Sequence, residues 1–534
     1  MCQRACTGKA VHETLTRPQS SLYGIFGSAG NRRIYCAEFA GGAEQKHVQA
    51  SIGPSVQADR VTRRWGKTVR ALEQSWHRAA YMTLQQLRGR PVGRFIRTLQ
   101  ARENLEQSSF KQLIGEELKE QLRYARAKVP LYSSGPWSQS LARDPTQLSA
   151  WPILDRATVR ARGSELLARG PRPGAFYRSS SASTGEPLRI AWNPHGAAWG
   201  WANEYRVMLW YGVPPGVRTL LMWGSEHRLQ DWVRNTRGFL TTALTPQRLE
   251  EAAQYVLQRQ PELVMGLPSA LVMLARYIRT NYPHAPRNLV RFAKLGGEQI
   301  YPFQREELEK HFGARAVEFY GCTEVGPIAA QCPEGSMHLL SDNVHIEICR
   351  DGEPLPNGEF GDIVATSLSN RAMPLVRCRI GDSGAISPDP CRCGRAYPVL
   401  ASLVGRASDL FMTADGSKVH GSQLGAGLQD LLATTPLGVI RQVLFQQIDP
   451  LHWKVLVESG GGFNAALAAQ LTELVRTNFG QQCQVETERV SVVPRETSGK
   501  FRYYRPPGPR PTSQEPVPIE SDYGRKHEDR LKMV

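Results

Sequence analysis

Between about residues 150 and 400, short apolar runs alternate with segments of helical spacing, and this alternation limits the possible folds more than any other feature. The segment TPQRLEEAAQYVLQRQ (245–260) has a threonine cap, a proline in its first turn and acidic residues after it, which predicts a helix. ELVMGLPSALVMLARYIRTNY (262–282) predicts a short buried strand, a turn and a helix. LVRFAKLGGEQI (289–300) and ARAVEFYGCTE (314–324) predict strands that end in polar loops. Such alternation is typical of an α/β fold, where ligands collect at the carboxyl ends of strands.

Other parts of the chain have different patterns, and 534 residues are too many for one ordinary core. Before the α/β region, FKQLIGEELKEQLRYARAKV (110–129) predicts a helix that ends before Pro130. VHIEICRDGEPLPNGEFGDIVATSL (344–368) predicts antiparallel strands with Pro/Gly turns. Beyond about residue 410, strand-like runs around a helical segment predict a small α+β domain.

The formal net charge of +17 is distributed unevenly. Residues 1–130 hold 22 Lys and Arg against 10 Asp and Glu, so most of the excess lies there. This favours a solvated basic face, with peripheral contact to a membrane surface or another anionic partner as the alternative. No nucleic-acid-binding signature accompanies the charge, so we expect no nucleic-acid partner. No apolar run predicts a membrane span or a secretory signal, and we expect a cytoplasmic protein.

Three cysteines and one histidine after residue 320 form a possible metal site. Cys332 and His338 are followed, after the antiparallel segment, by Cys391 and Cys393. Three thiolates and one imidazole match a closed, tetrahedral structural zinc site, which would join the two ends of that segment. The spacing is looser than in zinc fingers, so ordinary reduced cysteines are the alternative.

The stretch SSSASTGEP (179–187) contains six hydroxyl or carboxyl side chains and lies between two strand-like runs, GAFYRS and LRIAWN. We therefore expect the tip of a hairpin, where hydroxyls and backbone amides can surround a phosphate with neutral donors. A flexible linker is the alternative interpretation. No Walker motif is present in the chain.

Four further motifs suit a nucleotide. In FYGCTEVG, Tyr320 can lie against an aromatic ring, Thr323 can donate to phosphate, and Glu324 can bind Mg²⁺. In RCRIGDSG and GRASD, Asp382 and Arg406 can bind a ribose or phosphate. In ETSGK, Lys500 follows a Ser-Gly turn and can stabilise a developing phosphate anion. Each signal alone is also compatible with an ordinary polar turn.

In this order, the motifs resemble those of the adenylate-forming superfamily of acyl-CoA synthetases, peptide-synthetase adenylation domains and luciferases. Within it, the chain is most similar to the branch of phenylacetate–CoA ligases, capsule-biosynthesis proteins and coenzyme F390 synthetases. The cues are YARAKVPLY, WPILDRATVR, the GGE of 296–298, YGCTEVGPIAAQC and CRCGR. The resemblance covers about residues 110–505.

The resemblance implies a role for each matching residue. Ser180, Ser181, Ser183, Thr184 and Gly185 would form the phosphate loop. Gly297 and Glu298 would lie beside the adenine, and Tyr320 would lie on its ring. Thr323 and Glu324 would bind phosphate and Mg²⁺, and Asp382 and Arg406 would bind the ribose. Lys500 would bind the substrate carboxylate and the α-phosphate. We expect the acyl pocket near Trp223 and residues 266–270.

The chain departs from the usual loop sequence of this superfamily, Ser-Gly-Thr-Thr-Gly-Lys-Pro, at two positions. Ala182 stands where the first glycine is usual, and Glu186 stands where the lysine is usual. The alanine narrows the available backbone angles, and the glutamate removes a cation near the β- and γ-phosphates. At the hinge, Ser408 replaces the usual Asp or Lys.

The predicted fold is therefore a large N-terminal α/β domain with an antiparallel β subdomain, plus a small mobile C-terminal α+β domain. We expect a poorly ordered N-terminal extension over 1–64, a large AMP-binding domain over 65–404 with a helical entry at 65–150, a hinge at 405–409, the small domain at 410–505 and a disordered tail at 506–534.

The predicted function is ATP-dependent activation of a carboxylic acid, aryl or phenylacetate-like, as an acyl adenylate, followed by thioester formation with CoA. This is the activity of an AMP-forming acid–thiol ligase, with ATP, Mg²⁺ and CoA as reactants or cofactors. The alternatives are an adenylyltransferase of the F390 synthetase or capsule-biosynthesis type, which needs no CoA, and a nucleotide-binding protein that has lost catalysis.

Overall fold

The computed structural model describes residues 56–141, 144–180, 187–224, 228–404, 410–496, 499–505 and 507. The chain divides into two compact units, Met1–Leu72 and Glu73–Val534, and all the described strands lie in the second. The predicted hinge, almost all of the predicted tail and residues 1–55 of the predicted N-terminal extension lie outside the described residues. The predicted domain boundaries therefore stay predictions.

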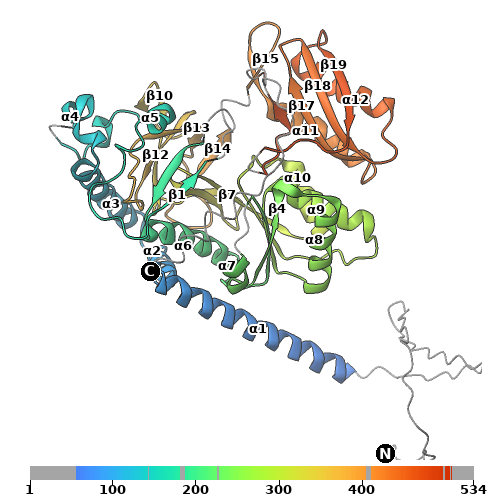
Figure 1. The fold of residues 1–534 in the computed structure, drawn as a ribbon, viewed down its shortest axis with the longest axis horizontal. Helices are drawn as coiled ribbons and strands as arrows, with labels where there is room; N and C mark the ends of the chain where they lie inside the picture. Colours follow the sequence, from blue (N-terminus) through green and yellow to red (C-terminus); the bar gives the residue numbers. More distant parts are fainter. Residues whose placement is uncertain are drawn as a thin grey trace, which may run out of the picture. The chain divides into compact units, whose positions relative to one another are not determined.

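Helices dominate the chain up to about residue 161 (Figure 1). The first helix begins at Val56, earlier than the helical pattern predicted from Trp65 onward. The predicted end before Pro130 is confirmed, because Val129 is already extended, with φ −96° and ψ 118°. Within the described residues no helix combines the length and apolar character that crossing a membrane requires. The helices of this region are α1 (Val56–Leu87), α2 (Val92–Arg102), α3 (Gln107–Lys128), α4 (Gly135–Ser140) and α5 (Arg156–Ala161).

The predicted α/β region forms a seven-stranded sheet in the order β4-β3-β5-β6-β7-β8-β9, in which β4 to β7 are parallel and β8 and β9 are antiparallel additions. The predicted helix start is confirmed, because the Thr245 side chain accepts from the backbone N–H of Arg248 at 3.3 Å. The elements are β3 (Thr219–Trp223), α7 (Arg228–Val233), β4 (Thr236–Leu240), α8 (Pro246–Arg259), β5 (Leu263–Gly266), α9 (Pro268–Asn281), β6 (Phe292–Leu295), α10 (Pro302–Phe312), β7 (Arg315–Cys322), β8 (Gly326–Gln331) and β9 (Met337–Leu339).

An ion pair joins α9 to α10 in this region. Glu307 on α10 accepts from Arg276 Nε of α9 at 2.7 Å and lies 3.2 Å from His311 Nε2. Burial opposes ionisation of Glu307, but the hydrogen bonds and charges of these two partners outweigh it and hold the pKa of Glu307 at about 2. The carboxylate is therefore a stabilising group of the native state wherever it is ionised.

The predicted antiparallel subdomain is confirmed as a five-stranded sheet in the order β11-β10-β12-β13-β14. Its apolar face shares one core with α3, the β1–β2 hairpin and β8, and the fully buried Trp151 and Trp192 lie in that core. The strands are β10 (Val344–Arg350), β11 (Glu353–Pro354), β12 (Gly361–Ser367), β13 (Cys378–Ile386) and β14 (Leu400–Val404); the hairpin of β1 (Phe176–Ser179) and β2 (Arg189–Trp192) is followed by α6 (Pro194–Trp210).

The predicted C-terminal α+β fold is also confirmed, as a four-stranded sheet in the order β19-β18-β17-β20 with two helices. Tyr301 and Phe303, at the start of α10, belong to the core of this C-terminal region, and their rings lie 5.6 and 5.4 Å from that of Tyr503. Aromatic side chains thus join α10 to the C-terminal region. The elements are β15 (Leu410–Met412), β16 (Lys418–His420), α11 (Leu424–Thr434), β17 (Ile440–Gln447), β18 (His452–Ser459), α12 (Ala465–Phe479), β19 (Gln484–Val490) and β20 (Tyr504–Arg505).

Candidate functional site

The predicted hairpin around the hydroxyl-rich loop is confirmed, with Ser179 of β1 opposite Arg189 of β2. Ser180 closes it, because its backbone N–H donates to the Leu188 carbonyl and its Oγ accepts from the Leu188 N–H, both at 2.9 Å. The other predicted loop residues, Ser181, Ser183, Thr184 and Gly185, lie outside the described residues, as do Ala182 and Glu186.

The YGCTEVG motif forms the turn of the β7–β8 hairpin rather than an open loop after a strand. Cys322 pairs with Gly326 across the turn, and Gly326 has φ +80°. A side chain at position 326 would also lie 3.3 Å from the Trp192 ring, so both backbone angle and space favour glycine here. Trp192 Nε1 donates to the Thr323 carbonyl at 3.2 Å and fixes the turn against the β1–β2 hairpin.

Tyr320 and Asp382, from two of the predicted motifs, are directly hydrogen-bonded. The Tyr320 hydroxyl donates to Asp382 Oδ2 at 2.7 Å, although 62 residues separate them. Burial and then the Asp382 charge raise the pKa of Tyr320 far above its usual value, so the phenol stays protonated. Gly381 and Asp382 lie within β13 itself, where its pairing with β12 is irregular, instead of in a separate turn.

Glu324 is buried at the same turn, with 2% of its side chain exposed. Arg156 Nη2, from the start of α5, lies 3.3 Å from Glu324 Oε1, and Arg156 Nη1 donates to the Ile380 carbonyl at 3.1 Å. Glu324 Oε1 accepts no hydrogen bond from the part of the chain that the structure describes. A buried carboxylate oxygen of this kind fits a hard cation such as Mg²⁺.

Gly297 follows β6 and lies against Trp223, at the end of β3. Gly297 has φ +84°, and a Cβ there would lie 2.8 Å from the Trp223 ring and 3.0 Å from the Leu267 side chain. Trp223 is 36% exposed, so its ring borders solvent-accessible space. The structure therefore brings together Trp223 and the 266–270 segment, both predicted for the acyl pocket, with the GGE motif.

The carboxylate of Glu298 is fully occupied by protein donors. Its oxygens accept from the Ser269 backbone N–H and from Ser269 Oγ, each at 3.0 Å, and from the backbone N–H of Phe501 at 2.6 Å. The last contact fixes the residue next to Lys500 at the carboxyl ends of the parallel strands. The location of Gly297 and Glu298 beside an adenine stays a prediction, as do the role of Lys500 and that of Arg406, which lies outside the described residues.

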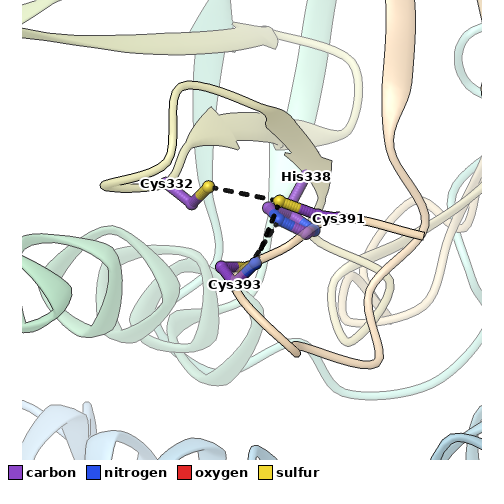
Figure 2. A group of neighbouring side chains, drawn as sticks. All are labelled: Cys332, His338, Cys391 and Cys393. Carbon is purple, nitrogen blue, oxygen red and sulfur yellow. Dashed lines mark hydrogen bonds between the residues drawn. The ribbon is translucent and has the colours of Figure 1, made fainter.

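The proposed metal ligands converge, as Figure 2 shows. One ligand atom from each of Cys332, His338, Cys391 and Cys393 lies within 4.8 Å of all the others. Cys332 Sγ and Cys391 Sγ are 3.8 Å apart, and two sulfurs bound to one tetrahedral zinc at about 2.3 Å would lie about 3.8 Å apart.

The orientation of the imidazole also fits a metal. His338 Nδ1 lies 2.9 Å from the Tyr397 carbonyl oxygen, which can only accept, so Nδ1 carries the proton. Nε2 then has a free electron pair, and it faces Cys393 Sγ at 3.1 Å. Metal-binding histidines commonly donate their other ring N–H to a carbonyl in this way. The residues present fit a structural zinc ion.

The sequence placed Ser269 only within the 266–270 segment expected near the acyl pocket, and it did not identify Arg495 or Arg156 as site residues. Ser269 lies in the GLPSA segment and Arg495 in VPRETSGK, so both were close to named motifs, but only three-dimensional contacts connect them to Glu298 and Lys500. A separate groove of about 720 Å³ along β4 and α8 contains none of the predicted site residues.

Comparisons with known proteins show which family and fold the chain is similar to. Residues 188–370 match the family model described as AMP-binding enzyme. The phenylacetate-coenzyme A ligases of Thermus thermophilus and Escherichia coli are 27% and 28% identical over 241 and 245 residues, which is 44% of this chain in each case and 50% and 52% of those proteins. The chain thus spans about half the length of the curated relatives it matches.

A solved structure of 2-hydroxyisobutyryl-CoA ligase in its postadenylation state, with an acyl-AMP bound, has the same fold. It superposes with a TM-score of 0.60 at 19% identity and covers 80% of this chain and 94% of its own. The open conformation of that ligase, with acyl-AMP and CoA bound, gives a TM-score of 0.50 at 21% identity, over 76% of this chain and 93% of its own.

Proposed function

Because the chain belongs to the AMP-binding, adenylate-forming superfamily, we propose that it activates a carboxylic acid with ATP and transfers the acyl group to the thiol of CoA. The observation that carries this proposal is the meeting of remote motifs at one end of the parallel strands. The Tyr320–Asp382 hydrogen bond joins two of them, and the Phe501–Glu298 hydrogen bond brings the Lys500 segment to a third.

In the proposed first step, a carboxylate oxygen of the substrate attacks the α-phosphorus of ATP, and the bond to the pyrophosphate oxygen breaks. The products are an acyl adenylate and pyrophosphate. Lys500 would stabilise the negative charge that develops on the α-phosphate, because a cation placed at that charge acts more strongly in the transition state than before it. Asp382 would hold the ribose, with Tyr320 fixing the carboxylate.

Mg²⁺ would be held by Glu324, and when bound it neutralises phosphate charge and so favours departure of pyrophosphate. Arg156 Nη2, which lies 3.3 Å from Glu324 Oε1, would orient this carboxylate. In the second step, the CoA sulfur attacks the acyl carbon, the bond to AMP breaks, and the thiol proton is released.

The acid is proposed to be aromatic and of the size of phenylacetate. Two observations support this. The distant curated relatives are phenylacetate-coenzyme A ligases, and the partly exposed Trp223 provides an aromatic wall beside Gly297.

The test is isotope exchange between pyrophosphate and ATP with a panel of arylacetic, benzoic and short aliphatic acids, followed by thioester detection with and without CoA. Exchange followed by an acyl-CoA product supports the proposal. Exchange without thioester favours an adenylyltransferase, and no exchange with any acid favours a binding protein that has lost catalysis. Lys500→Ala that retained full exchange would contradict the role given to this lysine.

We also propose that Cys332, His338, Cys391 and Cys393 hold a structural zinc ion. Four protein ligands leave no open coordination position, so this metal would have no part in the reaction. It would instead fix the loop after β8 to the segment before β14.

A further inference from the structure

The segment that carries Lys500 is bound on both sides of the lysine by residues at the carboxyl ends of the parallel strands. On one side, the Phe501 N–H donates to Glu298 Oε1 at 2.6 Å. On the other, Gly499 has φ +79°, and its Cα lies so close to Thr241 that a Cβ would clash with Thr241 Oγ1. The backbone of Lys500 is therefore held between two fixed points.

A second set of contacts joins Arg495 and Glu496 to Gly499 and Lys500. The Gly499 N–H donates to the Glu496 carbonyl at 2.8 Å, and the Glu496 N–H donates to the Lys500 carbonyl at 2.9 Å. Arg495 Nη1 donates both to the Gly499 carbonyl and to Ser269 Oγ, each at 3.1 Å. Arg495 thus links the turn to the same serine that binds Glu298.

The charges explain why these contacts depend on each other. Glu298 is buried, which raises the pKa of its carboxyl, while the positive charge of Arg495 acts in the opposite direction. A buried carboxylate is costly unless donors satisfy it. Glu298 accepts three hydrogen bonds. Two come from Ser269 and stay with the parallel sheet, whereas the third comes from the Phe501 N–H and is lost if the C-terminal region moves away.

We propose that Glu298, together with Ser269 and Arg495, is a latch that positions Lys500 for adenylate formation. Glu298 is a positioning residue, since protein donors bind its carboxylate and it acts on Lys500 through the backbone of Phe501. The inference rests on the proposed function for its catalytic consequence, but the latch itself is a contact that can be measured without any substrate.

The decisive variant is Glu298→Gln, which keeps the size of the side chain. Its amide can accept from Phe501 with its oxygen, but its NH₂ then faces the Ser269 N–H, and the charge beside Arg495 is lost. Ser269→Ala is the second variant, in case Glu298→Gln fails to fold. Glu306→Gln is the matched control, because Glu306 is an exposed glutamate that contacts Gln429 of the C-terminal region at 2.8 Å without approaching Lys500.

Three measurements are made on each full-length variant. The first is amide hydrogen exchange at Phe501, the second is pyrophosphate exchange with the best acid of the panel, and the third is thioester formation from chemically prepared acyl adenylate and CoA. For Glu298→Gln we expect at least tenfold faster exchange at Phe501, about 50-fold slower adenylation with KM values near those of the wild type, and a thioester rate within twofold. Ser269→Ala should shift in the same directions, and Glu306→Gln should match the wild type.

Equal slowing of both half-reactions would overturn the latch, because it would indicate a general structural role. So would an unchanged Phe501 exchange rate in Glu298→Gln. If the wild type adenylates no acid, the proposed function fails, and the hydrogen-exchange comparison alone still decides whether the latch exists.

Discussion

Removal of the metal from the Cys332/His338/Cys391/Cys393 cluster should lower stability by an amount that the chain separation sets. Cys332 and Cys391 are 59 residues apart. Treated as a cross-link that closes a loop of that length, the site removes about 4 kcal/mol of chain entropy from the unfolded state. For a domain of this size, about 2 °C of melting temperature corresponds to each kcal/mol. We therefore expect Cys391→Ser, or chelation of the wild type, to lower the melting temperature by about 8 °C.

The assay combines metal analysis with thermal unfolding in the presence and absence of a chelator. The control is Cys349→Ser, since Cys349 is buried in β10 of the five-stranded antiparallel sheet and lies outside the cluster. It should retain one zinc per chain and the full response to chelator, whereas Cys391→Ser should hold no zinc and show no further response. A wild type without zinc, with its four ligands reduced and intact, would refute the reasoning.

Three more predictions follow from the geometry. The pKa of Glu307 is about 2 in the folded protein, against a usual value of 4.5. The stability that its carboxylate provides is therefore complete above about pH 5, and the free energy of unfolding falls by about 2 kcal/mol between pH 6 and pH 3. Urea unfolding of Glu307→Gln should show a smaller decrease in this free energy over the same pH range. Tyr320→Phe removes the 2.7 Å bond to the carboxylate proposed for the ribose, so KM for ATP should rise about tenfold in steady-state kinetics. Gly297→Ala places a methyl group 2.8 Å from the Trp223 ring and should raise KM for the acid in the exchange assay at least tenfold, whereas Gly416→Ala, with the same φ sign but open space around it, should not.

Local sequence signals predicted several helices and strands correctly because their causes are local. The helix at 246–259 has its own cap in Thr245, and Pro130 stops a helix whatever surrounds it. The strands β8 and β9 were not predicted. Both are short, and long-range pairing with β7 fixes them rather than any pattern of their own.

The candidate site could be predicted where a residue type and its spacing restrict the chemistry. Three cysteines and a histidine bracketing an antiparallel segment identified the cluster before its geometry was known, and Figure 2 shows it assembled. Ser269, Glu298 and Phe501 could not be connected in this way. Glu298 lies 29 residues from one partner and 203 from the other, and a serine, a glutamate and a backbone amide have no spacing rule that links them.

The position of Glu298 next to Gly297 gives the two proposals a common physical basis. Gly297 packs against Trp223, so a ligand in the predicted acyl pocket that displaces the Trp223 ring would also displace Gly297. The next residue, Glu298, accepts from the backbone N–H of Phe501, which follows Lys500. Adjacent residues share a planar peptide bond, and a shift of one changes the direction of the next. A bound acid that moves the Trp223 ring therefore acts on the latch through a single peptide. The length of the side chain at 298 matters less for this coupling than the absence of a side chain at 297, because the positive φ of Gly297 sets the direction in which Glu298 leaves the strand.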